Sequence, residues 1–117
     1  MAAPNIVNVS AMYGKTAVLV VTTSATAIVT NTAASGKVLK VNALYVANVD
    51  GTNNATVDVD VYRSSTAYRI AYTITVPADA TLDLINKPLY LEEGDALRIT
   101  ASANSDLEAV CSYEEIS

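Results

Sequence analysis

Carboxylates at two places in this sequence could do chemistry, and the first pair is Asp58 and Asp60 in the stretch ATVDVDVY. Alternate residues of a β-strand point to the same face and lie about 6–7 Å apart. Two carboxylates at such a separation can act as the acid and base of a glycosidase, provided that a cleft surrounds them and one has a raised pKa. Nothing nearby supplies either feature. We therefore expect two solvated aspartates on the polar face of a strand.

The second place is the acidic turn Glu92-Glu93-Gly94-Asp95 within LYLEEGDALRIT. Its oxygens, and those of the loop NVDGTNN at 48–54, are of the kind that bind calcium. Neither segment has the spacing of an EF-hand loop, and Gly, Asn and Asp are the ordinary residues of tight turns. We expect the turn to be a corner between two strands, with its carboxylates solvated by water. Calcium or glycan binding by a loop stays open as an alternative.

The side chains that most often carry catalysis are missing or isolated. The 117 residues include no histidine, which removes Ser-His-Asp and Cys-His constellations. Cys111 is the only cysteine, so no disulfide can form within the chain, and its position among alternating apolar residues predicts a small buried hydrophobe. The four glycines are too dispersed to cradle a phosphate. We predict that the protein is not an enzyme, with no catalytic, cofactor-binding or metal-ligating residue and no cofactor.

The charge pattern argues against two classes of partner. The net charge is −5, and the seven basic residues are scattered along the chain. Binding of nucleic acid needs clustered Lys and Arg, and an anionic membrane surface would repel the protein. The start MAAPNIVNVS has neither the basic nor the apolar region of a signal peptide. We expect no nucleic acid and no membrane as partner.

The composition predicts one domain, over 1–117, that buries surface against other proteins. Hydrophobic residues make up 51% of the chain, enough for a core, although Phe and Trp are absent. Only 16% of the residues are charged, against about a quarter in typical soluble domains. Because so apolar a surface is unfavourable in water, we expect the protein to associate with itself, for example as a trimer.

Apolar and polar residues alternate with a period of two almost everywhere, which is the pattern of β-strands. Turn residues separate the segments, and no stretch shows the stripe of an amphipathic helix. About eight strands at near-regular spacing predict an all-β fold, either an antiparallel β-sandwich or a barrel. The expected strands are 16–23, 26–32, 37–49, 55–62, 67–76, 80–85, 96–103 and 107–116, with Leu89 and Leu91 continuing the alternation before the acidic turn.

Two of these strands have faces that bear on association. In KVLKVNALYVANV the alternation places Leu39, Val41, Ala43, Tyr45, Ala47 and Val49 on one face, and Leu44 and Val46 on the other. A strand that is apolar on both faces is covered on both sides, and a second subunit could supply one cover. In AYRIAYTITV the apolar face comprises Tyr68, Ile70, Tyr72, Ile74 and Val76. We expect core or interface packing there, and an exposed Tyr62 beside the two aspartates.

The quoted segments carry a family resemblance. The corner LYLEEGDALRIT resembles the one in jelly-roll assembly domains of the C1q and tumour-necrosis-factor type. This resemblance implies an antiparallel β-sandwich of the jelly-roll type rather than a barrel. Over residues 37–117, KVLKVNALYVANVDGTNNATVDVDVY, IAYTITVPADATLDLINKPLYLEEGDALRITASA and the ending SYEEIS resemble small virion proteins of tailed bacteriophages, marine and cyanobacterial phages included. Such proteins are β-sandwiches that work by packing, so no site residue follows from the resemblance.

The resemblance implies a structural protein that is made in the cytoplasm of the host bacterium and located in the virion, first of all a capsid decoration or cement protein. Its partners would be copies of itself and other virion proteins such as the major capsid protein. A neck, tail or fibre component is the alternative within the virion, and a carbohydrate-binding sandwich module is the alternative of another class. Residues 1–13 precede the regular strands and could form an N-terminal arm that adds to a neighbour's sheet edge.

Overall fold

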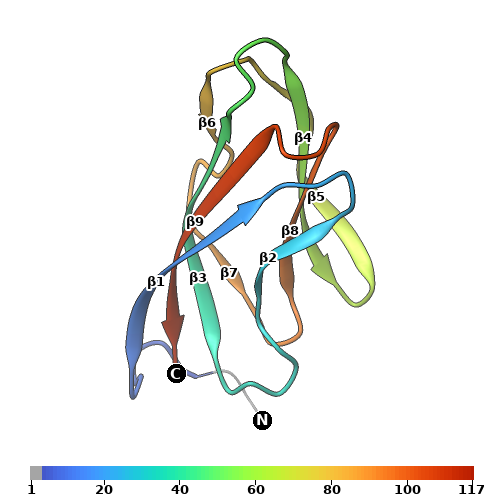
Figure 1. Ribbon diagram of the computed structural model, residues 1–117. Coiled ribbons are helices and arrows are strands. Elements are labelled where there is room, and N and C mark those ends of the chain that lie inside the picture. Colours follow the sequence, from blue (N-terminus) through green and yellow to red (C-terminus); the bar gives the residue numbers. More distant parts are fainter. Residues whose placement is uncertain (1–3) are drawn as a thin grey trace.

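The computed structural model describes residues 4–117, and over these residues the chain is all-β, with nine strands in two antiparallel sheets (Figure 1). The fold class predicted from the periodicity is therefore confirmed. The strands are β1 (Met12–Val20), β2 (Thr26–Thr30), β3 (Val38–Asn48), β4 (Ala55–Arg63), β5 (Thr66–Val76), β6 (Thr81–Asp83), β7 (Leu89–Leu91), β8 (Ala96–Ala101) and β9 (Leu107–Ile116).

The order of the strands is that of a jelly roll. One sheet runs β1-β9-β3-β6, with β7 also pairing with β3, and the other runs β2-β8-β4-β5. Successive strands thus cross repeatedly from one sheet to the other, as in the two interleaved Greek keys of that architecture. The short strands β6 and β7 share one position at the edge of the first sheet. Pro88 lies between them and has no N–H to donate to a ladder, which suits a position at an interrupted edge.

The core lies between the two sheets and is built from aliphatic side chains, as the absence of Phe and Trp requires. Fully buried Leu44, Leu91, Leu97, Ile99 and Leu107 are its largest members. Valines of β3 and β4 fill the space between them. Branching at Cβ favours these residues in strands, so the same side chains specify the strands and supply their hydrophobic stabilisation.

A β-bulge in β3 corrects the expected division of its apolar residues between the two faces. The pairing of β3 with β9 slips by one residue between Val41 and Ala43. Leu39 and Val41 are buried before the slip, and Leu44 and Val46 are buried after it, all in one core. The extra residue of a bulge moves the following side chains to the opposite face. Leu39 and Val41 therefore share the core face with Leu44 and Val46, while Tyr45 lies on the outer face and is 45% exposed.

Two bulges in β5 likewise break its expected single apolar face. Val57 lies opposite Ile74, and Val59 lies opposite Ala71, so β5 has one residue more than β4 in this interval. Asp60, the residue after Val59, lies opposite Arg69, so Ile70 is a second extra residue of β5. Thr73, inside the first bulge, has a φ of 54°, a backbone that non-glycine residues rarely adopt.

The expected N-terminal arm is only partly separate from the sandwich. β1 begins at Met12, so the last two residues of the 1–13 segment belong to the first sheet. Ser10 and Ala11 both donate backbone hydrogen bonds to the carbonyl of Ser117, and Ser117 donates one to Ala11. Residues 1–3 of the expected arm lie outside the described residues.

Candidate functional site

The acidic turn before β8 is tied to the end of β4 by an ion pair. Tyr62 of β4 lies opposite Ala96 of β8, and the next step of this antiparallel register brings Arg63 beside Asp95. The guanidinium donates from Nε to Oδ1 of Asp95 at 2.8 Å and from Nη2 to Oδ2 at 2.5 Å. Nη2 also donates to Glu92 Oε2 at 2.8 Å. Planar, two-pronged pairing of this kind gives both strength and a fixed geometry.

The sequence led us to expect a solvated Asp95, and this expectation is wrong. The side chain of Asp95 is only 2% exposed. Its Oδ2 also accepts a hydrogen bond from the Glu92 N–H. The pKa of Asp95 lies below its ordinary value, chiefly because of the hydrogen bond from Arg63, and the same pair raises the pKa of Arg63. This carboxylate stays ionised at neutral pH and works as a structural anchor of the turn.

Asn31, at the end of β2, connects the same turn to the β2–β3 loop. Its side-chain N–H groups donate to the carbonyls of Lys37 and Leu91, both at 2.9 Å, and its Oδ1 accepts from the Ser35 hydroxyl at 2.6 Å. Its backbone is bonded to Gly94 and Asp95. Nothing in the sequence pattern marked this buried asparagine, because a lone Asn after a strand usually predicts only a turn.

Asp58 and Asp60 do share a strand face, but the prediction that both are solvated is wrong for Asp60. This residue is only 4% exposed and lies opposite Arg98 on one neighbouring strand and Arg69 on the other. Arg98 Nε donates to Asp60 Oδ1 at 2.9 Å, while its guanidinium carbon lies 3.9 Å from the centre of the Tyr62 ring. Tyr62 is therefore covered by an arginine and only half-buried, rather than freely exposed.

Asp58 accepts a hydrogen bond at 2.6 Å from the backbone N–H of Thr73, within the bulge of β5. The two aspartates thus have different partners, an arginine for Asp60 and a backbone amide for Asp58. An acid–base pair needs both carboxylates directed at a shared cleft. Their hydrogen bonds instead stabilise the β8-β4-β5 sheet.

The loop between β3 and β4 is closed by its own side chains. Asp50 accepts hydrogen bonds from the backbone N–H of Thr52 and from Asn53, and these bonds lower the pKa of Asp50. Asn48, which is buried, donates to the carbonyls of Asn53 and Val76. Among residues 4–117 there is no group of three or more His, Cys, Asp or Glu side chains placed to hold a metal ion.

Cys111 lies in the core, as expected, and is fully buried between the sheets. Burial disfavours the thiolate and raises the pKa of this thiol to about 11. A thiol that stays protonated at neutral pH is a poor nucleophile. Its contribution is to packing.

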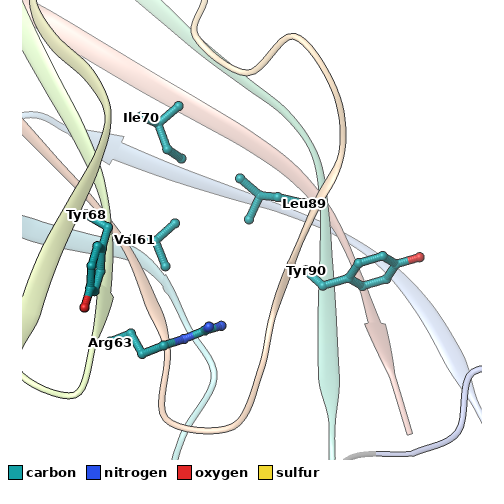
Figure 2. Close-up of a pocket in the computed structure, with 6 residues that line it drawn as sticks. All are labelled: Val61, Arg63, Tyr68, Ile70, Leu89 and Tyr90. Carbon is teal, nitrogen blue, oxygen red and sulfur yellow. The ribbon is translucent and has the colours of Figure 1, made fainter.

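A hollow of about 410 Å³ lies at the open side of the sandwich, between β4 and β5 of one sheet and β7 of the other. Figure 2 shows Leu89 pointing toward Val61 and Ile70, while the ring of Tyr90 points away. Tyr68 and Arg63 complete the lining, and Tyr68 is 58% exposed. Since Arg63 is already paired with Asp95 and Glu92, the hollow offers mainly apolar contact.

A second apolar surface covers the outer face of the first sheet. Val18 of β1 lies opposite Val110 of β9, which in turn lies opposite Tyr45 of β3. All three are exposed, Val18 by 74%, and Val20 extends the surface toward the end of β1. We call Val18, Val20, Tyr45 and Val110 the outer-face patch. A hollow of about 480 Å³ adjoins it along β1 and β9.

Over residues 4–117, no helix is long and apolar enough to cross a membrane.

Comparisons with known proteins identify the fold and no family. No protein-family model matches the chain, and no curated protein does. Among solved structures, the chain is similar to one from Bacillus endospore appendages, which are described as a novel family of disulfide-linked pili. The similarity has a TM-score of 0.53 at 14% identity, and it covers 92% of this chain and 87% of that one. At this identity the likeness supports a shared β-sandwich architecture.

Proposed function

We propose that this protein is a structural protein of a tailed-bacteriophage virion, acting as a capsid decoration or cement protein. The resemblance of residues 37–117 to small virion proteins supports the phage assignment. The observation that carries a packing role is the set of large apolar side chains left exposed on both sheets. They include the outer-face patch and the aromatic and aliphatic residues of β5, Tyr68, Ile70, Tyr72 and Ile74.

Burial of these side chains against capsid subunits would supply the binding energy. An interface of ordinary size covers about 800 Å² of each partner, against a total accessible surface of 6210 Å² for this chain. Apolar area removed from water contributes roughly 25 cal/mol per Å² before the cost of association. Many copies on a symmetric shell would add avidity, because each further contact is made at high effective concentration.

A second role within the virion is a neck, tail or fibre component. The pili of the structural neighbour are disulfide-linked, whereas the single cysteine of this chain is buried in the core. Any fibre built from this chain would therefore depend on non-covalent contacts. The number of copies per particle separates this role from decoration, since a shell needs hundreds of copies and a neck or tail tip only a few.

A carbohydrate-binding module is the alternative of another class. The feature that favours it is Tyr68, which lines the hollow and is 58% exposed, because a sugar ring can stack on an exposed aromatic side chain. A glycan array, run with and without calcium, tests this function. Binding of one sugar class that is lost in Tyr68→Ala would support it, whereas an array without hits would reject it.

The deciding experiment is electron microscopy of intact phage particles with a gold-labelled antibody against the protein. Label spread over the shell is the result expected for a decoration protein. Label confined to one vertex or to the tail would replace that role with a neck or tail role. Particles without label would overturn the virion assignment.

A further inference from the structure

The free edges of the two sheets are not equivalent. β5 carries two bulges, β2 shifts register between Ala27 and Val29, and β6 and β7 have three residues each. Bulges and short strands protect an edge against pairing with another chain. β1, at the edge of the first sheet, has nine residues in unbroken register with β9. It carries one charged residue, Lys15, which is paired with Glu115 at 3.3 Å.

The hydrogen bonds at the two ends of β1 reveal which backbone groups point to the free edge. Ala11 and Ser117 exchange two backbone bonds, and the N–H of Val21 donates to the carbonyl of Leu107. In an antiparallel ladder, every second residue bonds to the neighbouring strand. Odd-numbered residues of β1 therefore bond to β9. Even-numbered residues direct their N–H and C=O away from it, namely Met12, Gly14, Thr16, Val18 and Val20.

Such an edge is complementary to itself. If a second β1 strand lies antiparallel to the first, even-numbered residues must face even-numbered residues. Overlap of all nine residues then places Thr16 opposite Thr16 at a two-fold axis, and Met12 opposite Val20. In this register Lys15 faces Ala17 of the second copy. A shift that brings Lys15 opposite Lys15 would place like charges together, which destabilises a strand pair.

Gly14 supplies an independent observation. Glycine weakens the interior of a strand unless its backbone or its surroundings require it. Gly14 does not have a positive φ, and a Cβ built on it would have no atom of this chain within 4 Å. Within one copy the residue is therefore unexplained. In the fully overlapped pair, Gly14 lies directly opposite Val18 of the second copy, the most exposed member of the outer-face patch, and leaves room for it.

We infer that β1 is a homodimerisation edge, at which two copies pair antiparallel about Thr16 and join their first sheets into one continuous sheet. Cross-strand neighbours share a face, so the outer-face patches of the two copies lie on the same side of that sheet. The combined apolar surface is twice that of one chain. This inference deepens the self-association in the proposed function, with a two-fold arrangement in place of the trimer named as an example from the sequence.

Sedimentation equilibrium of the full chain over a concentration series tests the inference. The wild type should dimerise. Thr16→Lys places two lysines across the axis and should raise the dimer dissociation constant roughly tenfold or more. Thr30→Lys makes the same exposed change on the edge strand β2 and should leave association unchanged. Circular dichroism should show both variants folded. A monomeric wild type, or equal effects of the two variants, would overturn the inference.

Cross-linking tests the register. Thr16→Cys should give a covalent dimer with a short bifunctional maleimide, because the two introduced thiols flank the axis, while Cys111 is buried and does not compete. Thr30→Cys serves as the control and should give no covalent dimer. Equal cross-linking of the two variants, or none with Thr16→Cys, would reject this register.

The outcomes separate this inference from the proposed function. A chain that dimerises through β1 but never labels phage particles would support the edge and overturn the virion role. A chain that labels particles while the free protein is monomeric would support the virion role and overturn the homodimer. In that case the free edge of β1 would be available to pair with a strand of another virion protein.

Discussion

Arg63 and Asp95 are adjacent in the continued register of β4 and β8, and each holds the other at the point where both strands reach the acidic turn. The pair joins the last residue of β4 to the residue that precedes β8. Asp95 is buried and ionised, so its arginine cannot be removed without leaving an uncompensated charge. Hydrogen bonds and ion pairs of the acidic turn thus connect β4, β8 and the β2–β3 loop.

The stability of the protein should fall in acid, and Asp95 should account for a measurable part of the fall. Its pKa is lowered in the folded state by Arg63. The resulting stabilisation is complete above the unfolded value of about 3.9 and is lost as the pH falls through the lower folded pKa. The pKa of Glu115 is likewise lowered by Lys37 and Lys15, so protonation of Glu115 in acid also reduces the stability of the fold.

Urea unfolding at pH 7 and at several values below pH 4 measures this effect. Asp95→Asn should be less stable at pH 7 by about 1.5–3 kcal/mol, the usual contribution of hydrogen bonds to a charged group, and its stability should depend less on pH. Asp79→Asn, at an exposed aspartate, is the control and should behave as the wild type. An unchanged pH dependence in Asp95→Asn would contradict the assignment.

Asn31→Ala should destabilise the fold through unsatisfied carbonyls. The substitution removes the donors to Lys37 and Leu91, and the bond to the Leu91 carbonyl is buried. Each buried polar group left without a partner costs about 1–3 kcal/mol. Thermal and urea unfolding should show this loss. Asn86→Ala, at an exposed position, should change stability little, and equal effects of the two substitutions would refute the role of Asn31.

Alanine at Gly94 and at Gly14 should have opposite effects on stability. Gly94 has a φ of 91°, where an L-residue is strained by about 1–2 kcal/mol. Gly14 has no positive φ, so alanine there should stabilise the strand by about 0.5–1 kcal/mol. Both should be measured in the Thr16→Lys background, so that association does not contribute. The same sign for both would show that backbone conformation is not the cause.

Cys111 should react with thiol reagents only when the chain unfolds. Its thiol is buried and has a pKa of about 11, so little thiolate is exposed at pH 8. The rate of reaction with a chromogenic disulfide should rise steeply through the urea transition. Cys111→Ser would bury a hydroxyl that has no hydrogen-bond partner. It should lower the free energy of unfolding by about 1–3 kcal/mol, more than Cys111→Ala does. Rapid labelling of the native protein would contradict its burial.

The period of two was enough to predict the class of fold and the place of most strands, because each strand has one face in the core. The bulges were missed. In β3 the residues of the core cluster run 39, 41, 44, 46, with one interval of three among intervals of two. The sequence hides this interval, because residues 43, 45 and 47 are apolar as well. The buried Asp60 and Asp95 could not have been predicted in the same way. Their burial depends on which strands lie opposite, and one sequence with several possible pairings does not specify that Arg98 and Arg63 face them.

The backbone bonds between Ala11 and Ser117 have a practical consequence for protein engineering. They place the two sequence-distant segments side by side at one end of the sandwich, while the β3–β4 loop and the start of β9 lie at the other end (Figure 1). A short linker between these segments would therefore span little distance. A circular permutant opened at the exposed Ser64–Ser65 turn should keep every strand pairing, and it would move the chain ends to a different part of the surface for the attachment of labels or cargo.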